Sequence, residues 1–404
     1  MARLPAFRSG HHLQLLEGSR EFFPAMVAAI DAARVEVLFE TYIFDFTGSA
    51  AEVAYAFERA ARRGVAVRVV VDGFGTAALE GSWRERLEAA GVRWLVYSPL
   101  GALGLLVPGQ WRRLHRKLCV VDGEVGFCGG INILDEFHDP NHGLLTSPRL
   151  DFSIRVMGPI VAEMRSTMLR QLVRIDAIGQ LRRARLGSAL ELWRSADAGR
   201  QPAPPIQSDG DPDAKAALLL RDNVRNRAVV ERAYLRAIGQ AREEIIIANA
   251  YFVPGGRIRR ALVMAAKRGV RVVLLLQGRY EYFMQYYASR PVFGALLAAG
   301  VEIHEYAPSF LHAKVAVIDG HWATVGSSNL DPLSFLLARE ADVVVDDRRF
   351  ADVLRQRLLK AVEMEGNRMD AGAFERRPPL QRFKERVARV LMRLAISIQG
   401  QKYR

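Results

Sequence analysis

Cysteine is scarce in this chain of 404 residues, which contains only Cys119 and Cys128. Both lie in short apolar runs, a setting typical of small buried side chains in strands. The sequence therefore gives no indication of a disulfide framework. No group of cysteines and histidines has the spacing of zinc ligands, so the sequence predicts no structural zinc site.

Long hydrophobic runs are also missing. No run reaches the roughly 18 apolar residues of a helix that spans a membrane. The first twenty residues contain charges, Pro5 and two histidines, but no apolar core of a signal peptide. We therefore expect a protein of the cytoplasmic side that is soluble or bound peripherally to the cell membrane.

Negative charge is in short supply. The chain has 57 Lys and Arg against 44 Asp and Glu, a formal net charge of +13. With half of its residues apolar, it otherwise has the composition of a globular protein with two or three domains. The excess of positive charge predicts an anionic partner, which could be phosphate esters, an acidic membrane surface or nucleic acid.

What the sequence does contain is one motif in two copies. In both copies, lysine follows histidine by two positions, aspartate follows lysine by five, and a Gly-x-x-Asn begins seven positions after the aspartate. The first copy consists of His115, Lys117, Asp122, Gly129 and Asn132, and the second of His312, Lys314, Asp319, Gly326 and Asn329. Each fragment alone would be ordinary, but five matched positions repeated at fixed spacing indicate a shared function.

The spacing predicts a β-hairpin for each copy. Histidine and lysine share one face of a strand, because side chains alternate along it. Asp122-Gly123 and Asp319-Gly320 are hairpin-turn dipeptides between apolar runs. The glycines that end each return strand let backbone N–H groups approach a ligand. Imidazole, ammonium, amide and bare N–H groups together suit a phosphate, with imidazole acting on its phosphorus or leaving group.

The repeat extends beyond the motifs. Predicted helices at 20–34 and 49–63 and strands at 35–42, 65–71 and 93–97 recur, in the same order, at 224–242, 256–268, 244–251, 270–275 and 302–306. Alternating strands and helices predict two α/β domains, each a mixed, largely parallel sheet flanked by helices. We assign these domains to residues 1–186 and 214–365. The proline-containing segment 187–213 is the predicted linker.

Three further features accompany the repeat. Asp151 and Glu340 each open a strand after a hairpin and are candidates to hold a histidine in one tautomer, although surface salt bridges are the alternative. An apolar, glycine-rich insert lies within 100–113, either as a lid or acyl-chain contact or as an ordinary buried loop. The segment 138–149, with His138 and His142, receives no role.

The tail, 366–404, is strongly basic. Residues 374–404 contain nine Lys and Arg against two Glu, with Phe383, Val387, Leu391, Leu394 and Ile398 on one helical face. A basic amphipathic helix favours an anionic membrane surface. A helix docked on its own domain or on a partner protein is the alternative.

At the two hairpins the sequence resembles the phospholipase D superfamily, whose signature is His-x-Lys, four residues, Asp, six residues, then Gly-Ser/Gly-x-Asn, in two copies. Within that superfamily, the segments that begin at His115, Gly129, Asn249 and Trp322 look like those of bacterial cardiolipin synthases, in particular the type B form without N-terminal membrane spans. The similarity covers about residues 10–365. One departure is Gly130, where many relatives have serine.

The resemblance implies a pseudo-two-fold arrangement with one active site at the interface of the two domains and no metal or cofactor. One histidine would attack phosphorus and the other would act as acid and base; by analogy these are His115 and His312, an order that the sequence leaves open. Phosphate-binding residues would be Lys117, Lys314, Asn132, Asn329, Gly129, Gly326 and Ser327. Asp122 and Asp319 belong to the catalytic signature, but we interpret both as turn residues.

The implied reaction is transfer of a phosphatidyl group from one phosphatidylglycerol to another, giving cardiolipin and glycerol at the cytoplasmic face of the membrane. The basic tail and the insert at 100–113 would contact the anionic lipid surface, and nucleic acid is not an expected partner. Hydrolysis by a phospholipase D-type enzyme is the alternative, with a nuclease or a non-catalytic lipid-binding protein less favoured. The sequence leaves open the acceptor alcohol and the oligomeric state.

Overall fold

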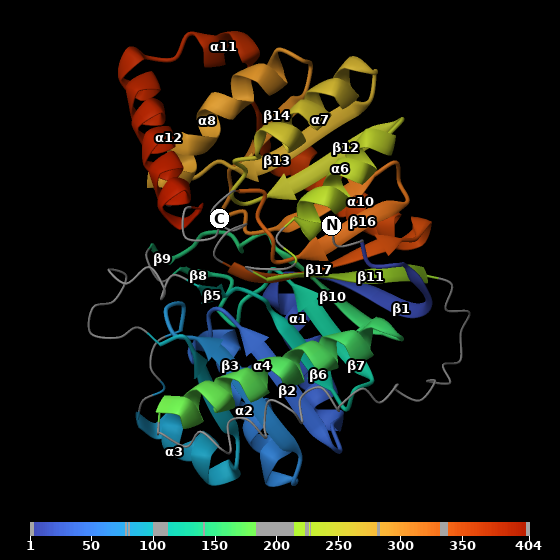
Figure 1. Cartoon of the computed structure of the whole chain (residues 1–404), viewed down its shortest axis with the longest axis vertical. Helices are drawn as coiled ribbons and strands as arrows, with labels where there is room; N and C mark the ends of the chain where they lie inside the picture. The colour runs from blue at the N-terminus through green and yellow to red at the C-terminus, as the bar shows by residue number, and fades with distance from the viewer. Residues whose placement is uncertain are drawn as a thin grey trace.

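The computed structural model describes residues 4–76, 79, 81–99, 112–139, 142–182, 214–222, 226, 228–280, 283–331 and 338–400. Figure 1 shows two halves stacked along the long axis, each a sheet flanked by helices. We call them the N half (residues up to 182) and the C half (residues from 214). The predicted linker 187–213 and the insert at 100–111 lie outside the described residues.

The elements of the N half are β1 (Arg8–Glu17), α1 (Gly18–Ala32), β2 (Glu36–Thr41), η1 (Gly48–Ala50), α2 (Ala51–Arg62), β3 (Ala66–Asp72), α3 (Gly81–Ala90), β4 (Arg93–Tyr97), β5 (Arg113–Leu114), β6 (Leu118–Val121), β7 (Val125–Gly129), β8 (His138–Asp139), β9 (Gly143–Leu144), β10 (Phe152–Met157) and α4 (Ile160–Arg182).

The elements of the C half are β11 (Ala214–Arg221), α6 (Val229–Gln240), β12 (Glu244–Asn249), α7 (Gly256–Lys267), β13 (Arg271–Gln277), α8 (Phe283–Leu297), β14 (Glu302–Tyr306), β15 (Lys314–Ile318), β16 (Trp322–Gly326), β17 (Ala338–Asp346), α10 (Arg348–Glu365), β18 (Gly366–Arg368), α11 (Ala371–Glu375) and α12 (Pro379–Gly400).

One sheet runs through both halves. Its order is β18-β14-β13-β12-β15-β16-β17-β11-β1-β10-β7-β6-β2-β3-β4, and β5 pairs with β17 off this path. Strands β1 and β11 join the halves as an antiparallel pair. Read outward from that pair, each half presents a closing strand, a hairpin and three parallel strands, and the C half adds β18 at its outer edge. The predicted duplication is therefore present as a pseudo-two-fold arrangement.

The sheet is mixed, but less of it is parallel than the alternation of strands and helices predicts. The parallel pairs lie outside, in β2-β3-β4 and β12-β13-β14, where crossover helices connect consecutive strands. The motif hairpins and the strands that follow them pair antiparallel. A tight Asp-Gly turn reverses the chain, so each hairpin must run antiparallel.

The repeated Arg-Gly-Val at the end of a helix has a structural basis in both halves. Gly64 and Gly269 both have φ of +90°, a conformation that glycine adopts without strain. The arginine before each glycine donates a 3.0 Å hydrogen bond to a carbonyl at the end of the preceding helix, Arg63 to Ile30 and Arg268 to Ile238. The arginine thus ties two helices together on each outer face.

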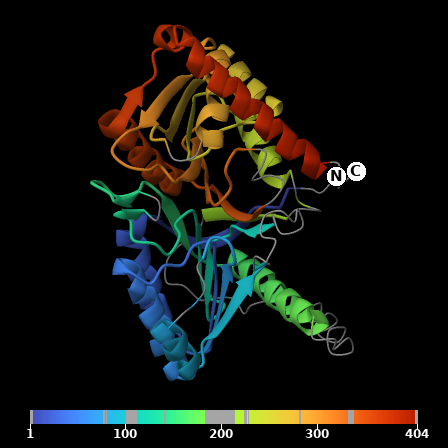
Figure 2. The same cartoon turned by 90° about the vertical axis from the view of Figure 1, so that its left-hand side faces the viewer.

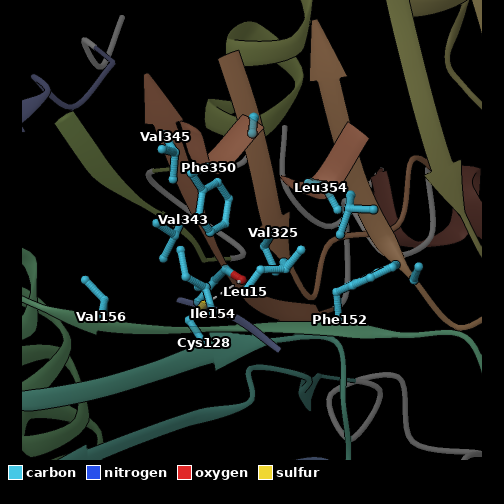
Figure 3. Close-up of a cluster of buried hydrophobic side chains, with 14 of the residues drawn as sticks. Leu15, Cys128, Phe152, Ile154, Val156, Val325, Val343, Val345, Phe350 and Leu354 are labelled. Atoms are coloured by element: carbon cyan, nitrogen blue, oxygen red, sulfur yellow. Dashed lines mark hydrogen bonds between the residues drawn. The ribbon is translucent and has the colours of Figure 1, made fainter. Parts of the chain in front are cut away.

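The largest apolar core lies between the two halves. Figure 3 shows side chains from β1, β7 and β10 meeting those from β16, β17 and α10. Leu15 and Ile154 approach from the N half, and Val325 and Val343 from the C half; all four are buried. Burying one such side chain contributes about 1.5–3 kcal/mol. A half on its own would expose this layer to water, so the halves fold as one unit.

Candidate active site

Both His-x-Lys segments lie where the halves meet. His115 and Lys117 connect β5 to β6, while His312 precedes β15 and Lys314 is its first residue. The backbones interlock: the N–H of His115 donates to the carbonyl of Arg339, and that of His312 to the carbonyl of Leu150. Each motif is thus fixed by a strand or loop of the opposite half.

The two histidines are held by carboxylates in a crossed pattern. Nδ1 of His115 lies 3.0 Å from Oε2 of Glu340, and Nδ1 of His312 lies 2.6 Å from Oδ2 of Asp151. Glu340 and Asp151 are 0% and 4% exposed. The two carboxylates named as candidates therefore do meet the histidines, each across the interface rather than within its own half.

The crossed contacts determine the tautomer of each ring. A carboxylate only accepts hydrogen bonds, so Nδ1 carries the proton and Nε2 keeps a free lone pair. Nζ of Lys314 lies 2.9 Å from Nδ1 of His312 as well. A protonated Nδ1 cannot accept from that ammonium, and we assign the proton to the shorter contact with Asp151. Nε2 is then the reactive nitrogen in both histidines.

The two lysines are almost completely buried. Lys117 and Lys314 are 4% and 1% exposed, and each ammonium donates to the carbonyl of the histidine two residues before it. Burial and the neighbouring Lys314 lower the pKa of Lys117 to about 7. Burial and the second ammonium both disfavour the charged form of Lys117, and an anion bound beside it would favour that form.

The histidines are neutral in the free site. Burial lowers the pKa of both, and the ammonium of Lys314 lowers that of His312 further, well below its ordinary value. His115 also lowers the pKa of His312. Neutral imidazoles are the form that can attack phosphorus or accept a proton.

The carboxylates differ in strength as acceptors. Burial raises the pKa of Asp151 to about 6, partly offset by Lys314. Burial also acts on Glu340, but His115 and Arg221 hold its pKa below the ordinary value. Arg221, 1% exposed, lies 3.8 Å from Glu340. Glu340 is therefore the more firmly ionised of the two.

Two site residues were not among those predicted from the sequence. The ring of Tyr42 lies 5.0 Å from the imidazole of His115, between ring centres, and Nζ of Lys117 lies 5.5 Å from the same tyrosine ring. Arg221 supports Glu340 as described above. Tyr42 stands at the end of a predicted strand, next to the motif hairpin, which was the available signal. Nothing local in the sequence indicates the role of Arg221.

The asparagines lie beside the motifs but are held differently. Oδ1 of Asn132 accepts a 3.2 Å hydrogen bond from the N–H of Ile43. Asn329 is 3% exposed, and within the described part of the chain its Oδ1 has no hydrogen-bond partner. Asn249 accepts from the N–H of Leu330 and so fixes the turn that carries Asn329.

The glycines and serine predicted to bind phosphate have structural constraints of their own. A Cβ at Gly129 would lie 2.2 Å from Oγ of Ser153, and one at Gly326 would lie 2.0 Å from Oδ1 of Asp342. The hydroxyl of Ser327 is fully buried and exchanges hydrogen bonds with the backbone of Ala341. Its side chain therefore faces β17, and its backbone N–H also donates to the carbonyl of Ala341.

The signature aspartates lie at the far ends of the hairpins. Asp122 and Asp319 have φ of +52° and +49°. The carboxylate of Asp122 accepts from the N–H groups of residues 34–36, and that of Asp319 from those of residues 242–244, at 2.8–3.0 Å. These contacts agree with the interpretation of both as turn residues.

The segment 138–149, which received no role, forms the hairpin of β8 and β9 beside the site. Arg149 donates to the carbonyl of Asp135 at 3.0 Å and to Oδ2 of Asp139 at 2.9 Å. The ring of His142 lies against Phe310, with centres 4.9 Å apart. The hairpin is thus braced two residues before Asp151, and the charge of Arg149 acts on both Asp151 and His312.

Comparison with known proteins agrees with this architecture. The family described as "Cardiolipin synthase, PLD-like domain" matches residues 26–145 and 234–361. Cardiolipin synthase B of Escherichia coli (strain K12) is 36% identical over 92% of this chain and 85% of its own length. Cardiolipin synthase of Geobacillus kaustophilus is 30% identical over 96% of this chain and 74% of its own.

The fold has a relative among solved structures. The phosphatidylserine synthase of Haemophilus influenzae superposes with a TM-score of 0.66 at 12% identity, covering 98% of this chain and 96% of that one. At this identity the likeness concerns the fold alone. No helix among the described residues is long and apolar enough to cross a bilayer. Together with the two matched regions and the duplicated hairpins, the sequence relationships show that this chain belongs to the cardiolipin synthase family of phospholipase D-like proteins.

Proposed function

We propose that the chain is a phosphatidyltransferase that makes cardiolipin and glycerol from two molecules of phosphatidylglycerol. The observation that carries the proposal is the crossed pairing of His115 with Glu340 and of His312 with Asp151 around two buried lysines. Such a site offers two neutral Nε2 atoms and two cations to one phosphodiester. Its relatives named cardiolipin synthase direct the choice of substrate.

The reaction proceeds by two displacements at phosphorus. Binding of the anionic phosphodiester raises the pKa of His312, whose Nε2 takes up a proton from water. In the first displacement, Nε2 of His115 attacks, the P–N bond forms, and the P–O bond to the headgroup glycerol breaks as that proton reaches the leaving oxygen. In the second, His312 removes the proton from a hydroxyl of another phosphatidylglycerol. That oxygen attacks phosphorus and His115 leaves. The assignment of the two roles follows the family analogy.

The cations stabilise the charge that builds up on phosphorus. Lys117 and Lys314 lie on both sides of the pseudo-axis, and Asn132 and Asn329 follow the return strands. Preorganised donors in a dry site stabilise a transition state more than water does, because they need no reorientation. The phosphate also restores the charged form of Lys117, whose pKa is lowered to about 7 without it.

An anionic membrane at its cytoplasmic face is the proposed location of the reaction, because both substrate and product are lipids. The basic tail, 374–404, supports this setting. Of the other predicted contact, 100–113, only residues 112 and 113 fall within the described part of the chain.

Incubation of the purified protein with phosphatidylglycerol vesicles, with and without added glycerol, tests the proposal. Cardiolipin formed without glycerol, and reversed by excess glycerol, supports transfer. Phosphatidic acid as the main product would show that the enzyme hydrolyses its substrate instead of transferring the phosphatidyl group. No turnover would indicate a lipid-binding protein. His115→Ala and His312→Ala should each abolish turnover. The matched control is His321→Ala, which should retain turnover. His321 lies in the turn of the second hairpin, is half-exposed and pairs with Asp346.

A nitrophenyl phosphodiester separates the two histidines, because its leaving group needs no proton. With this substrate His312→Ala should accumulate a covalent phosphohistidine at His115, detectable by mass spectrometry after rapid denaturation. His115→Ala should form none. Accumulation in His115→Ala instead would exchange the two roles.

A further inference from the structure

The C-terminal helix α12 rests on the C half through one of its faces. Its buried residues Glu385 and Ala388 face α8, where Ala388 packs in one cluster with Val253 and Ala288. Arg377 anchors the start of the helix by two 3.0 Å contacts with Glu385. The docked face thus contains the only acidic residue of α12, and its charge is neutralised by that arginine.

A second face of α12 carries large apolar side chains that this docking does not cover. Leu380 is 66% exposed, Phe383 62%, Val390 54% and Leu391 48%. Their spacing places them on one side of the helix. The exposed residues Arg382 and Arg386 lie along its edge. Isolated apolar side chains at a surface are common, but an apolar stripe bordered by arginines is not.

The hairpin of β8 and β9 presents another such side chain. Leu144 is 84% exposed, whereas its neighbour Leu145 is 7% exposed and packs inward. Arg149 and Asp139 brace the hairpin from below. A leucine on a braced turn loses little conformational entropy when it enters an apolar phase.

These two features lie on the same side of the molecule. In Figure 1, α12 descends along the left side, and β8, β9 and the motif strand β5 are labelled below its end on that side. Figure 2 turns this side to the viewer and shows α12 at its front. The motif segment that follows β5 begins with His115. Helix α12, the hairpin of β8 and β9, and strand β5, which leads to His115, therefore lie on the same side of the molecule.

We propose that Leu380, Phe383, Val390 and Leu391 of α12, together with Leu144 of β9, form a membrane-docking surface that inserts into an anionic bilayer. This inference rests on the proposed function and adds the orientation of the enzyme. Apolar side chains enter the acyl boundary while Arg382 and Arg386 bind acidic headgroups. The arginines favour a lipid surface over an apolar protein groove. Acidic headgroups supply anions for both guanidinium groups, whereas an apolar groove supplies none.

Co-sedimentation of the full chain with vesicles tests the surface. Val390→Asp and Leu144→Asp should each weaken binding to vesicles of phosphatidylglycerol and phosphatidylcholine by about tenfold or more. Each places a charge where an apolar side chain would be buried in the bilayer. Val353→Asp is the matched control, because this valine is also helical and 44% exposed but lies on α10. Its binding should equal that of the unaltered protein. Equal binding of all three variants would overturn the proposal.

Two further measurements distinguish failure of the docking surface from failure of the proposed function. With short-chain phosphatidylglycerol below its critical micelle concentration, Val390→Asp and Leu144→Asp should turn over as fast as the control, while on vesicles they should be slower. Loss of turnover on the soluble substrate would contradict a docking role. If the unaltered protein turns over neither substrate, the proposed function fails while the vesicle-binding result still stands. A change from dimer to monomer in Val390→Asp, with vesicle binding intact, would assign the stripe to self-association.

Discussion

The carboxylate of Asp151 fills the space that a side chain at Gly130 would need. A Cβ at Gly130 would lie 2.2 Å from Oδ1 and 2.8 Å from Oδ2 of Asp151. The second half has Ser327 at the matching position and a longer carboxylate, Glu340. The departure from serine at position 130 is therefore coupled to the shorter side chain of Asp151. A serine there would displace the carboxylate that holds His312.

We accordingly expect Gly130→Ala to separate Asp151 from His312 and to lower kcat by about 10-fold or more, because the imidazole loses its orienting acceptor. Steady-state turnover of phosphatidylglycerol measures this. Gly239→Ala, in helix α6 with no atom within 4 Å of the added Cβ, is the control and should keep full activity. A fully active Gly130→Ala would show that the carboxylate can move without consequence.

Asp122 is expected to act on stability and not on chemistry. Asp122→Ala leaves the three N–H groups of residues 34–36 without their acceptor and places alanine at φ +52°, which should lower the free energy of unfolding by about 2–4 kcal/mol. Asp122→Asn keeps an acceptor and tolerates this backbone conformation. Urea unfolding and turnover should show a folded, active asparagine variant. An inactive but equally stable asparagine variant would make Asp122 a catalytic residue.

Lys117 is expected to support turnover while its burial lowers the free energy of unfolding. Its pKa falls from 10.5 to about 7 in the folded chain, so the folded state binds its proton less readily than the unfolded state. The resulting destabilisation is complete below pH 7 and shrinks as pH rises from 7 toward 10.5. Lys117→Met should abolish turnover and yet raise the free energy of unfolding at pH 6, on the order of a few kcal/mol.

The gain in Lys117→Met should decline between pH 7 and pH 10. Denaturant titrations of both proteins at a series of pH values measure the difference. A gain that is independent of pH would mean that burial of the ammonium is not its cause.

The acid limb of the pH profile should report Asp151. Its pKa is about 6, and the pKa values of both histidines are lowered by burial. Below pH 6 the carboxyl loses its negative charge and accepts only weakly from Nδ1 of His312, so kcat/KM should fall as pH drops through 6. Asp151→Asn should lower kcat/KM about 100-fold or more at neutral pH and remove this limb, because an amide does not titrate there.

Asp346→Asn, at the exposed partner of His321, is the control for that profile and should leave it unchanged. An acid limb that persists at pH 6 in Asp151→Asn would assign the titration to another group.

Much of the fold could be predicted because the duplication constrains it twice. The positive φ of Asp122 and Asp319 follows from an Asp-Gly turn between apolar runs, and the matched helix ends follow from repeated Arg-Gly-Val. The antiparallel interior was less predictable. Pairing of β1 with β11 joins residues on both sides of the linker, and such long-range contacts leave no periodic pattern in the sequence.

The site was predictable in its parts but not in its connections. Asp151 and Glu340 stand out as carboxylates that open strands, yet nothing local tells which histidine each one meets. That depends on β5 pairing with β17 and on Leu150 bridging to Leu311. The buried hydroxyl of Ser327 shows the converse case, because a signature residue that suits a phosphate is held by the sheet instead.

The continuous sheet sets a limit on how substrates reach the phosphorus site. Strands β1 and β11 bond the halves edge to edge, the apolar layer of Leu15 and Val343 closes behind them, and each imidazole is pinned from across the seam. A hinge movement that opened the two halves would break the hydrogen bonds between β1 and β11. It would also separate both imidazoles from their carboxylates. Substrates and products must therefore enter and leave the site while the two halves stay joined.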